Sequence, residues 1–373
     1  NLQRGWGGAE QHTLMLSRGL QARGVYVVLA CHPAGELRRR AADAGIPTAP
    51  VTVRNQMDPT AGIRLGAKLR SHRLDLLHLH SPKEYLAGPT AAKVSNAGKV
   101  VLTRHILLKL KPPMVRLYNS VDAVVACSGL ARDALRRYGV EESRLAVIRG
   151  GTDISPFLGI DVEQKALARK EFLVPPGAIS IGTTSRLERC KGHAVLLEAL
   201  CRIGNRHSIL LLVAGAGDQL AALQQQAADL GVASHVRFLG FCTEIARVLA
   251  AADIAVLATI DPELEQYPIS VMEAMAAGLP QVATRVGALE DMVTQEVTGL
   301  LVEPGSSTEL AAALERLICD SQGRQKMGAA ARVAARERFA MDTMIDDAMN
   351  LYSRLLAGAG RHQVEAPDSM ARR

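Results

Sequence analysis

The chain lacks several features that mark particular protein classes. Its six cysteines are scattered and include no Cys-x-x-Cys pair, which argues against a zinc site built on cysteines and against a disulfide framework. It has no run of about 18 apolar residues, so we expect no transmembrane helix. Aromatic residues make up only 3% of the chain, and no recognised nucleic-acid motif is present. We therefore predict a cytoplasmic protein with no nucleic-acid partner.

The charge of the chain is unevenly distributed. Residues 1–155 carry 23 Lys and Arg against 11 Asp and Glu, a net charge of +12. The remaining residues carry 21 against 26, a net charge of −5, and the two values sum to the +7 of the whole chain. A basic first half predicts an anionic partner there, either a phosphorylated acceptor or a membrane surface.

Short apolar runs alternate with helical patterns along the 373 residues. Because these runs are continuous, they are typical of parallel strands that are buried on both faces. The predicted strands are 25–31, 74–80, 100–104, 123–127, 145–149, 179–184, 209–214, 235–239, 254–258, 281–285 and 299–302. Helices are predicted in the gaps between these strands, for example at 9–22, 129–138, 191–204, 218–230, 269–277 and 307–319. The fold class is therefore α/β, with two doubly wound, Rossmann-like domains facing a cleft.

The domain limits follow from a proline-containing segment between the two series of strands. We predict, in order, a first Rossmann-like domain, a connection, a second Rossmann-like domain, a helix that returns to the first domain, and a mobile tail, at 1–155, 156–177, 178–340, 341–357 and 358–373. The loop that contains Gly7 and Gly8 would normally follow a strand in a βαβ unit, yet few residues precede it. We therefore expect the first strand of the first sheet to be missing.

Two carboxylates lie eight positions apart, with Pro268 and a helix-start signal between them. We expect Glu265 on a loop and Glu273 in the early turns of a helix. The helix N-terminus near Ile269 and Ser270 can bind an anion, because its free N–H groups and its dipole point outward. This arrangement suits a nucleotide sugar. The alternative is a capping box in which Glu273 only stabilises the start of the helix.

Two further groups of residues suit phosphate binding. Arg186 and Lys191 follow the predicted strand 179–184, and open α/β sheets bind ligands at the C-terminal ends of their strands. A solvated basic turn is the alternative for this pair. Gly7 and Gly8 open the first helix, where glycine lets a phosphate or a sugar approach the backbone closely. A simple loop before the helix is the alternative there.

Gly215 and Gly217 follow the predicted strand 209–214 and open a helix. A dinucleotide fingerprint would need a third glycine where Leu220 stands, so that motif is excluded. We expect instead a turn, or a backbone segment that a ligand approaches closely.

Taken in order, four of these segments resemble glycosyltransferase family 4, a family of retaining enzymes with the GT-B fold. They are Gly7-Gly8-Ala9-Glu10, the stretch from Ser185 to Gly192, the Glu265–Glu273 pair, and the stretch from Gly299 to Gly305. The resemblance implies a hexosyltransferase-type enzyme that transfers a sugar from a nucleotide-sugar donor to a carbohydrate or glycolipid acceptor, with retention of configuration. It also implies a place in lipopolysaccharide, exopolysaccharide or glycolipid synthesis.

The resemblance assigns roles to matching residues. Arg186 and Lys191 would hold the donor diphosphate and offset the charge of the leaving nucleotide. Glu273 would accept hydrogen bonds from the ribose, and Glu265 would meet hydroxyls of the transferred sugar. Backbone N–H groups at the start of the intervening helix would contact phosphate.

His105, at the end of the predicted strand 100–104, matches a histidine near the reacting centre in several family members. The alternative is a surface histidine at the end of a strand. His78, His80 and Asp153 are weaker candidates, and Asp153 fits the end of the first domain better. No Asp-x-Asp triplet occurs, which agrees with a metal-independent transferase. We expect no metal site and no cofactor other than the nucleotide-sugar co-substrate.

Three positions depart from the family pattern. Gln266 stands where glycine commonly follows the first Glu, Tyr267 where Phe is frequent, and Ser185 where Gly often precedes the Arg. The Gln266 side chain could narrow the sugar pocket, so the identity of the donor stays open. Two other functions also stay open: a nucleotide-sugar epimerase or hydrolase on the same architecture, and a non-catalytic nucleotide-sugar-binding module.

The segment 106–117 interleaves apolar and basic side chains. Such a segment can insert its apolar groups into a bilayer while Lys and Arg meet lipid phosphates. Peripheral attachment to the inner face of the cytoplasmic membrane is therefore one interpretation. An active-site loop with a buried apolar face is the other.

Overall fold

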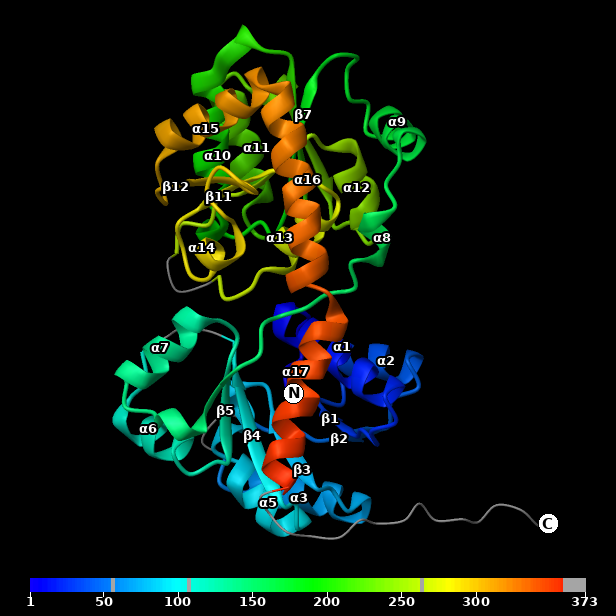
Figure 1. Cartoon of the computed structure of the whole chain (residues 1–373), viewed down its shortest axis with the longest axis vertical. Coiled ribbons are helices and arrows are strands. Elements are labelled where there is room, and N and C mark those ends of the chain that lie inside the picture. Colours follow the sequence, from blue (N-terminus) through cyan, green and yellow to red (C-terminus); the bar gives the residue numbers. More distant parts are fainter. Residues whose placement is uncertain (55–57, 106–108, 262–264, 358–373) are drawn as a thin grey trace, which may run out of the picture.

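The computed structural model of the protein describes residues 1–54, 58–105, 109–261 and 265–357. It has two lobes stacked along the long axis, each built of parallel strands covered by helices (Figure 1). The predicted α/β class with two Rossmann-like domains is therefore confirmed. None of the described helices combines the length and the apolar character that crossing a bilayer requires.

The first lobe contains a four-stranded parallel sheet in the order β3-β4-β5-β6 and a separate parallel pair, β1-β2. The strands are β1 (Leu29–Cys31), β2 (Thr48–Pro50), β3 (Leu76–Leu79), β4 (Lys99–Arg104), β5 (Ala123–Ala126) and β6 (Leu145–Val147). The helices are α1 (Gly8–Ala22), α2 (Glu36–Asp43), α3 (Ala61–Leu69), α4 (Pro82–Tyr85), α5 (Gly88–Ser95), α6 (Pro112–Tyr118) and α7 (Gly129–Arg137). The predicted strand 25–31 is wrong over its first four residues, and β2 was not predicted.

Both faces of the four-stranded sheet are buried. Val101 and Val125 pack on one face in a cluster with Leu16 of α1, whereas Leu102 and Val124 pack on the other face. Successive residues of a strand point to opposite faces, so a strand that is covered on both sides must be apolar throughout. This is why continuous apolar runs located β4 and β5 in the sequence.

The first two residues of the chain lie between the two sheets of this lobe. The backbone nitrogen of Asn1 donates a hydrogen bond to the carbonyl oxygen of Ala30 in β1 at 2.9 Å. The N–H of Leu2 donates to the Glu84 carboxylate in α4 at 3.0 Å, and Leu2 is buried in the core. Among the described residues, β1 pairs with β2 and not with β3.

The second lobe contains a six-stranded parallel sheet in the order β12-β11-β10-β7-β8-β9. The strands are β7 (Ile179–Thr184), β8 (Ile209–Ala214), β9 (Val236–Gly240), β10 (Ile254–Leu257), β11 (Gln281–Thr284) and β12 (Gly299–Val302). The helices are α10 (His193–Ile203), α11 (Leu220–Asp229), α12 (Ile245–Ala251), α13 (Ile269–Ala276), α14 (Leu289–Met292), α15 (Ser307–Cys319) and α16 (Ser321–Arg338). All six strands of this sheet were predicted to within one residue at each end.

Two segments connect the lobes. The first follows β6 and leads into α8 (Ser155–Leu158) and α9 (Val162–Glu171), which both pack against the second lobe. The second is the step from α16 into α17 (Met341–Ala357). Helix α17 lies along the first lobe (Figure 1), where Ile345 packs against Leu16 and Leu20 of α1. The contact is close, since a Cβ at Gly19 would lie 1.8 Å from a methyl carbon of Ile345. The predicted tail, 358–373, lies outside the described residues.

Candidate functional site

The site in the second lobe lies where the order of the strands reverses. The chain passes from β7 to β8 and β9 on one side, and then crosses to β10, β11 and β12 on the other. Open α/β sheets bind ligands in the crevice that such a reversal leaves at the carboxyl ends of the strands. Lys191 lies on the loop after β7 and Glu265 on the loop after β10. Residues predicted from two distant segments therefore meet at this crevice.

Lys191 and Glu265 are in direct contact. The Nζ atom of Lys191 lies 2.5 Å from Oε1 of Glu265, and their side chains are 15% and 4% exposed. The same oxygen accepts a hydrogen bond from the Thr259 hydroxyl at 2.6 Å. Charges this deeply buried are unfavourable unless they are paired and hydrogen-bonded. Each of the two groups therefore holds the other in the crevice.

The loop after β11 holds the backbone of Glu265. The N–H of Ala288 donates to the carbonyl oxygen of Glu265 at 2.7 Å. Gly287 has a φ of +54°, and a Cβ there would lie 1.8 Å from the same oxygen. Only glycine allows this approach. The position of Glu265 is therefore fixed by backbone contacts as well as by its side chain.

The glycines after β8 bring their loop against the loop that carries Arg186. A Cβ at Gly215 would lie 1.9 Å from the carbonyl oxygen of Ser185, and one at Gly217 would lie 2.2 Å from that of Leu187. In the structure, these glycines therefore make room for the backbone of the loop from Ser185 to Leu187. The Arg186 side chain is 64% exposed and pairs with Glu188, so its guanidinium is open to the solvent beside the crevice.

His193, which was not predicted, supports the same loop. Its Nε2 atom lies 3.1 Å from the Ser185 hydroxyl and 3.2 Å from the carbonyl oxygen of Arg186. Burial lowers the pKa of His193, so the ring is neutral at neutral pH. In the sequence, only the position of His193 directly after Gly192, at the start of α10, indicated that it lies close to this loop.

Glu273 lies within α13, and the capping-box alternative is wrong. Pro268 is the N-cap residue, no side chain caps the helix, and Ser270 and Glu273 both lie inside it. Among the residues that the structure describes, the Glu273 carboxylate has no hydrogen-bond or ion-pair partner. Burial raises the pKa of Glu273 to about 7. A partly buried carboxyl without a partner, beside a helix N-terminus, is suited to accept hydroxyl groups of a ligand.

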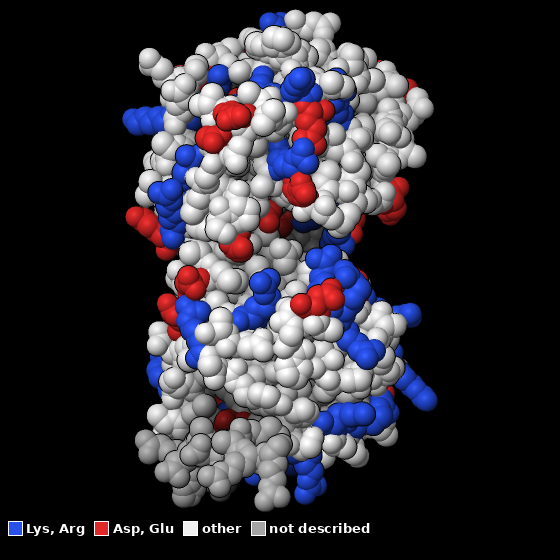
Figure 2. All heavy atoms as spheres, turned by 90° about the vertical axis from the view of Figure 1, so that its right-hand side faces the viewer, with Lys and Arg blue, Asp and Glu red and all other residues white. Residues whose placement is uncertain are grey.

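Helix α13 also faces the first lobe. A Cβ at Gly150, which follows β6, would lie 3.1 Å from the Met272 side chain and 3.2 Å from Cβ of Tyr267. The crevice of the second lobe therefore lies at the junction of the two lobes, where the molecule narrows (Figure 2).

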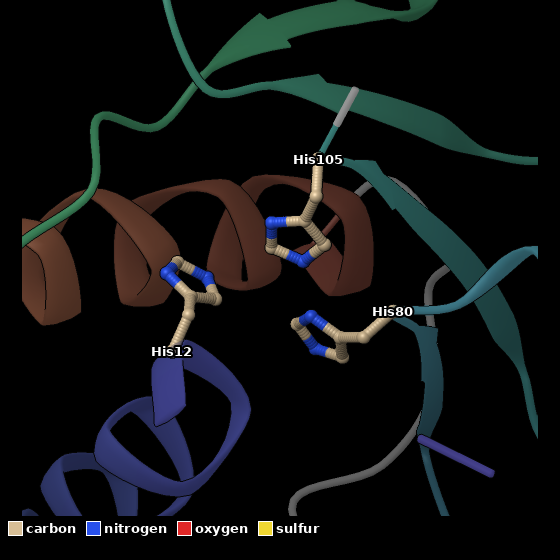
Figure 3. A group of neighbouring side chains, drawn as sticks. All are labelled: His12, His80 and His105. Carbon is tan, nitrogen blue, oxygen red and sulfur yellow. The ribbon is translucent and has the colours of Figure 1, made fainter. Parts of the chain in front are cut away.

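In the first lobe, three histidines gather at the carboxyl ends of the strands (Figure 3). His80 follows β3, His105 follows β4, and His12, which was not predicted, lies in the first turns of α1. The ring centroids of His12 and His105 are 5.0 Å apart. Burial lowers the pKa of His12 to about 4, and it lowers the pKa values of His80 and His105 well below the usual range.

The other candidates of the first lobe lie apart from these rings or are fully bonded. His78 makes two hydrogen bonds of 2.6 Å, with the Tyr352 hydroxyl and the Thr103 hydroxyl. Asp153 accepts a hydrogen bond from the backbone N–H of Ser155 in a short turn. Gly7 is the N-cap of α1, and Gly8 is exposed, with no other described atom within 4 Å of a Cβ built there apart from its chain neighbours and the nearby backbone of its own helix. The start of α1 is therefore open.

Comparison with known proteins agrees with this architecture. The model of the glycosyltransferase family 4 domain matches residues 6–156, and that of the glycosyl transferases group 1 matches residues 164–334. The phosphatidyl-myo-inositol mannosyltransferase of Mycobacterium leprae is 28% identical over 96% of this chain and 96% of its own length. A glycosyltransferase of Methanocaldococcus jannaschii is 28% identical over 65% of this chain, but the match spans only 63% of that protein.

One further relative and one solved structure are also similar to this chain. The amylovoran biosynthesis glycosyltransferase AmsK of Erwinia amylovora is 32% identical over 61% of this chain and 54% of its own length. The crystal structure of Anabaena HepE in complex with UDP-glucose has a TM-score of 0.81 and 25% identity, covering 95% of this chain and 98% of that one. The fold is that of the GT-B glycosyltransferases. The chain belongs to glycosyltransferase family 4.

Proposed function

We propose that the protein transfers a sugar from a nucleotide-sugar donor to a hydroxyl group of an acceptor, with retention of configuration. The observation that carries this proposal is the convergence of Lys191, Glu265 and the N-terminus of α13 at the strand-order reversal of the second lobe. A cation, a carboxylate and free backbone N–H groups are what a sugar joined to a diphosphate requires. The residues lie close together although the chain brings them from two separate loops.

The proposed mechanism depends on the charge of the leaving group. When the bond from the sugar to the diphosphate breaks, negative charge grows on the departing nucleotide. Arg186, Lys191 and the N–H groups at Ile269 and Ser270 would stabilise that charge more strongly in the transition state than in the ground state. Positive charge that a divalent ion supplies in other transferases would come from these groups, so we propose a metal-independent reaction. No side chain is assigned as a nucleophile.

The carboxylates would recognise the donor. Glu273 has a raised pKa and no partner among the residues that the structure describes, and ribose hydroxyls that donate to it would favour its ionised form. Glu265 would meet hydroxyls of the transferred sugar while Lys191 turns toward phosphate. The complex of HepE with UDP-glucose supports a uridine diphosphate sugar as the first donor to test.

The first lobe would hold the acceptor. Basic side chains are prominent on its surface, whereas both signs of charge mix over the second lobe (Figure 2). His105 lies at the end of β4 and would stand near the reacting hydroxyl. Relatives that act on phosphatidyl-myo-inositol or in amylovoran biosynthesis support a glycolipid or polysaccharide acceptor. We therefore propose a role in lipopolysaccharide, exopolysaccharide or glycolipid synthesis at the cytoplasmic face of the membrane.

Nucleotide release tests the proposal. The chain is screened against a panel of nucleotide sugars with carbohydrate and glycolipid acceptors, and the anomeric configuration of any product is read by NMR. Arg186→Ala should lower kcat by about 10²–10³-fold, as loss of a charge-stabilising donor does in other enzymes, and should lower donor affinity less. Arg189→Ala, an exposed cation of the same loop, is the matched control and should change neither.

Other outcomes would point elsewhere. Nucleotide release with no transferred product would favour a hydrolase, and an altered nucleotide sugar would favour an epimerase. Donor binding without turnover for any acceptor would favour a binding module. Proportional losses of affinity and kcat in Arg186→Ala would contradict the role in the transition state.

A further inference from the structure

Three histidine rings from three separate elements of the first lobe point toward one space (Figure 3). They belong to His12 of α1, to His80 after β3 and to His105 after β4. Each residue offers a ring nitrogen, and the three nitrogens lie within 4.8 Å of one another. The three histidines are far apart in the sequence, so no spacing motif predicts the cluster. From the sequence we expected no metal site.

Two of these rings present buried nitrogen atoms that are not satisfied by the described protein. Nδ1 of His80 and Nε2 of His105 are both inaccessible to solvent and without a hydrogen-bond partner in the described part of the chain. Most buried polar atoms in proteins are satisfied, so these two nitrogens are available to a ligand that enters the space between the rings. These two atoms lie on rings that face the same space.

We propose that His12, His80 and His105 form a binding site for a divalent transition-metal ion of the zinc type. Neutral imidazole is a preferred ligand of Zn²⁺, Ni²⁺ and Cu²⁺. Three histidines with a fourth position left open is a known arrangement for zinc. The proposed occupant is a metal ion, and its fourth ligand would be water or an oxygen of the acceptor.

The spacing of the rings fits such an ion. Three imidazoles bound tetrahedrally at Zn–N distances of about 2.0–2.1 Å have ring centroids roughly 5 Å apart. The observed centroid distances are 5.0 Å between His12 and His105, and 5.8 Å for each of the other two pairs. Closing the site therefore requires side-chain movements of less than about 1 Å, which rotation about χ angles can supply.

The surroundings orient the rings for metal binding. The Cys127 thiol donates to the carbonyl oxygen of Arg104, and its sulfur lies 3.7 Å from Nδ1 of His105. When Nδ1 of His105 donates its hydrogen to the sulfur, the lone pair of Nε2 points into the space between the three rings. In metal sites, a hydrogen-bond partner at one ring nitrogen commonly fixes the tautomer of a ligand histidine in this way. The ring of His78 packs on that of His80, with centroids 4.0 Å apart.

His78 does not belong to the ligand set. Both of its ring nitrogens are engaged, one by Tyr352 and one by Thr103. It therefore positions His80 without competing for the metal.

A consequence for activity rests on the proposed function. His105 is the residue that would stand near the reacting hydroxyl, so a metal that holds its Nε2 atom would withdraw it from the acceptor. Micromolar Zn²⁺ should then inhibit transfer, and a chelator should restore it. The binding claim stands apart from this, because binding is measured with no donor present.

In the experiment, the chain is first made metal-free with a chelator. It is then titrated with Co²⁺, followed by visible absorption, and separately with Zn²⁺, followed by calorimetry. One tightly bound ion per chain and visible bands of four-coordinate cobalt are expected. His12→Gln and His80→Gln should each weaken binding by more than the roughly 10–100-fold that loss of an outer-sphere partner causes. His235→Gln, a histidine of the second lobe that pairs with Asn205, is the control and should bind like the parent.

Further controls distinguish loss of the site from loss of the fold and from binding by thiols. Circular dichroism of each metal-free variant establishes that it is folded, and Zn²⁺ should raise the melting temperature of the parent but not that of His12→Gln. A Cys201→Ala, Cys319→Ala variant removes the two exposed thiols, which could also capture metal. Binding that survives in folded His12→Gln and His80→Gln, or that disappears with the thiols, would overturn the proposal. If the chain binds the metal but transfers no sugar even after the metal has been removed, the proposed function would be refuted and the metal site would stand.

Discussion

The ammonium group of Lys191 lies 2.5 Å from Oε1 of Glu265, and this contact joins the loop after β7 to the loop after β10. Both groups are expected to bind the same ligand, yet here they neutralise each other. A donor diphosphate would compete for the lysine, and sugar hydroxyls would compete for the carboxylate. The ion pair therefore compensates the two buried charges in the absence of donor. When the donor binds, its diphosphate would replace Glu265 as the partner of Lys191, and its sugar hydroxyls would replace Lys191 as the partner of Glu265.

The first prediction concerns the stability of this pair. Lys191→Met leaves a buried carboxylate without its cation and should lower the free energy of unfolding by about 3–5 kcal/mol. The double variant Lys191→Met, Glu265→Gln should lose less than the sum of the two single variants, because no uncompensated charge remains. Urea denaturation of the four proteins measures this coupling. Additive losses would show that the contact is not energetically significant.

The second prediction concerns pH. Burial raises the pKa of Glu273 from 4.5 to about 7, so between these values the folded chain binds a proton that the unfolded chain has lost. Stability should therefore fall as pH rises through this window, by about 3 kcal/mol at about 1.4 kcal/mol per unit. Denaturation at pH 5 and pH 8 should show the fall in the parent, and Glu273→Gln should show much less of it.

Donor binding should reverse this effect, because ribose hydroxyls favour the ionised carboxylate. Binding at pH 6.5 should then release a proton, which calorimetry in two buffers of different ionisation enthalpy detects. Glu273→Gln should bind nucleotide about 10–100-fold more weakly, since hydrogen bonds to a charged group contribute about 1.5–3 kcal/mol. Proton release that persists in Glu273→Gln would assign the titration to another group.

The third prediction concerns membranes. Lys109 and Lys111 belong to the predicted membrane segment, of which residues 106–108 lie outside the described residues, and both side chains are exposed. Each basic residue near an anionic surface contributes about 1 kcal/mol, so neutralising both should weaken sedimentation with phosphatidylserine vesicles by roughly 30-fold. Neutralising the exposed Lys170 and Lys326 in the same way is the control. Equal sedimentation of the two double variants would exclude this surface.

Much of the second lobe could be predicted from sequence, because its signals are local. A run such as Ile209–Ala214 is buried at every position, and a short apolar run that ends at glycine is typical of a strand covered on both faces. The roles of Gly215 and Gly287 could not be predicted in this way. Each is required by a backbone oxygen that comes from another part of the chain, so the constraint appears only when the loops are folded together.

The first lobe shows the same limit more strongly. His12, His80 and His105 form one cluster, but no spacing relates them, since α1, β3 and β4 are brought together only by the packing of the sheet. Strand β2 is three residues long and ends in Pro50, which has too little pattern for detection. Long helix α16 was also missed, since its interior is rich in Ala and Arg and has few large apolar residues to mark a buried face.

The last prediction concerns Gln266, the residue that follows Glu265 where glycine is common in the family. Its side chain is 6% exposed, and neither atom of its amide has a partner in the described part of the protein. An amide buried without a partner next to the expected sugar site should form hydrogen bonds with the transferred sugar, since leaving it unsatisfied is unfavourable. Gln266→Gly should therefore lower kcat/KM for the preferred donor by at least about 10²-fold. Binding of the free nucleoside diphosphate, which lacks the sugar, should stay within about twofold of the parent. The same panel of nucleotide sugars should also show relaxed discrimination, because the wider pocket no longer selects one pattern of hydroxyls. Parallel losses for the sugar donor and the free nucleotide would instead indicate a damaged fold around Glu265, and an unchanged donor preference would place Gln266 outside the sugar pocket.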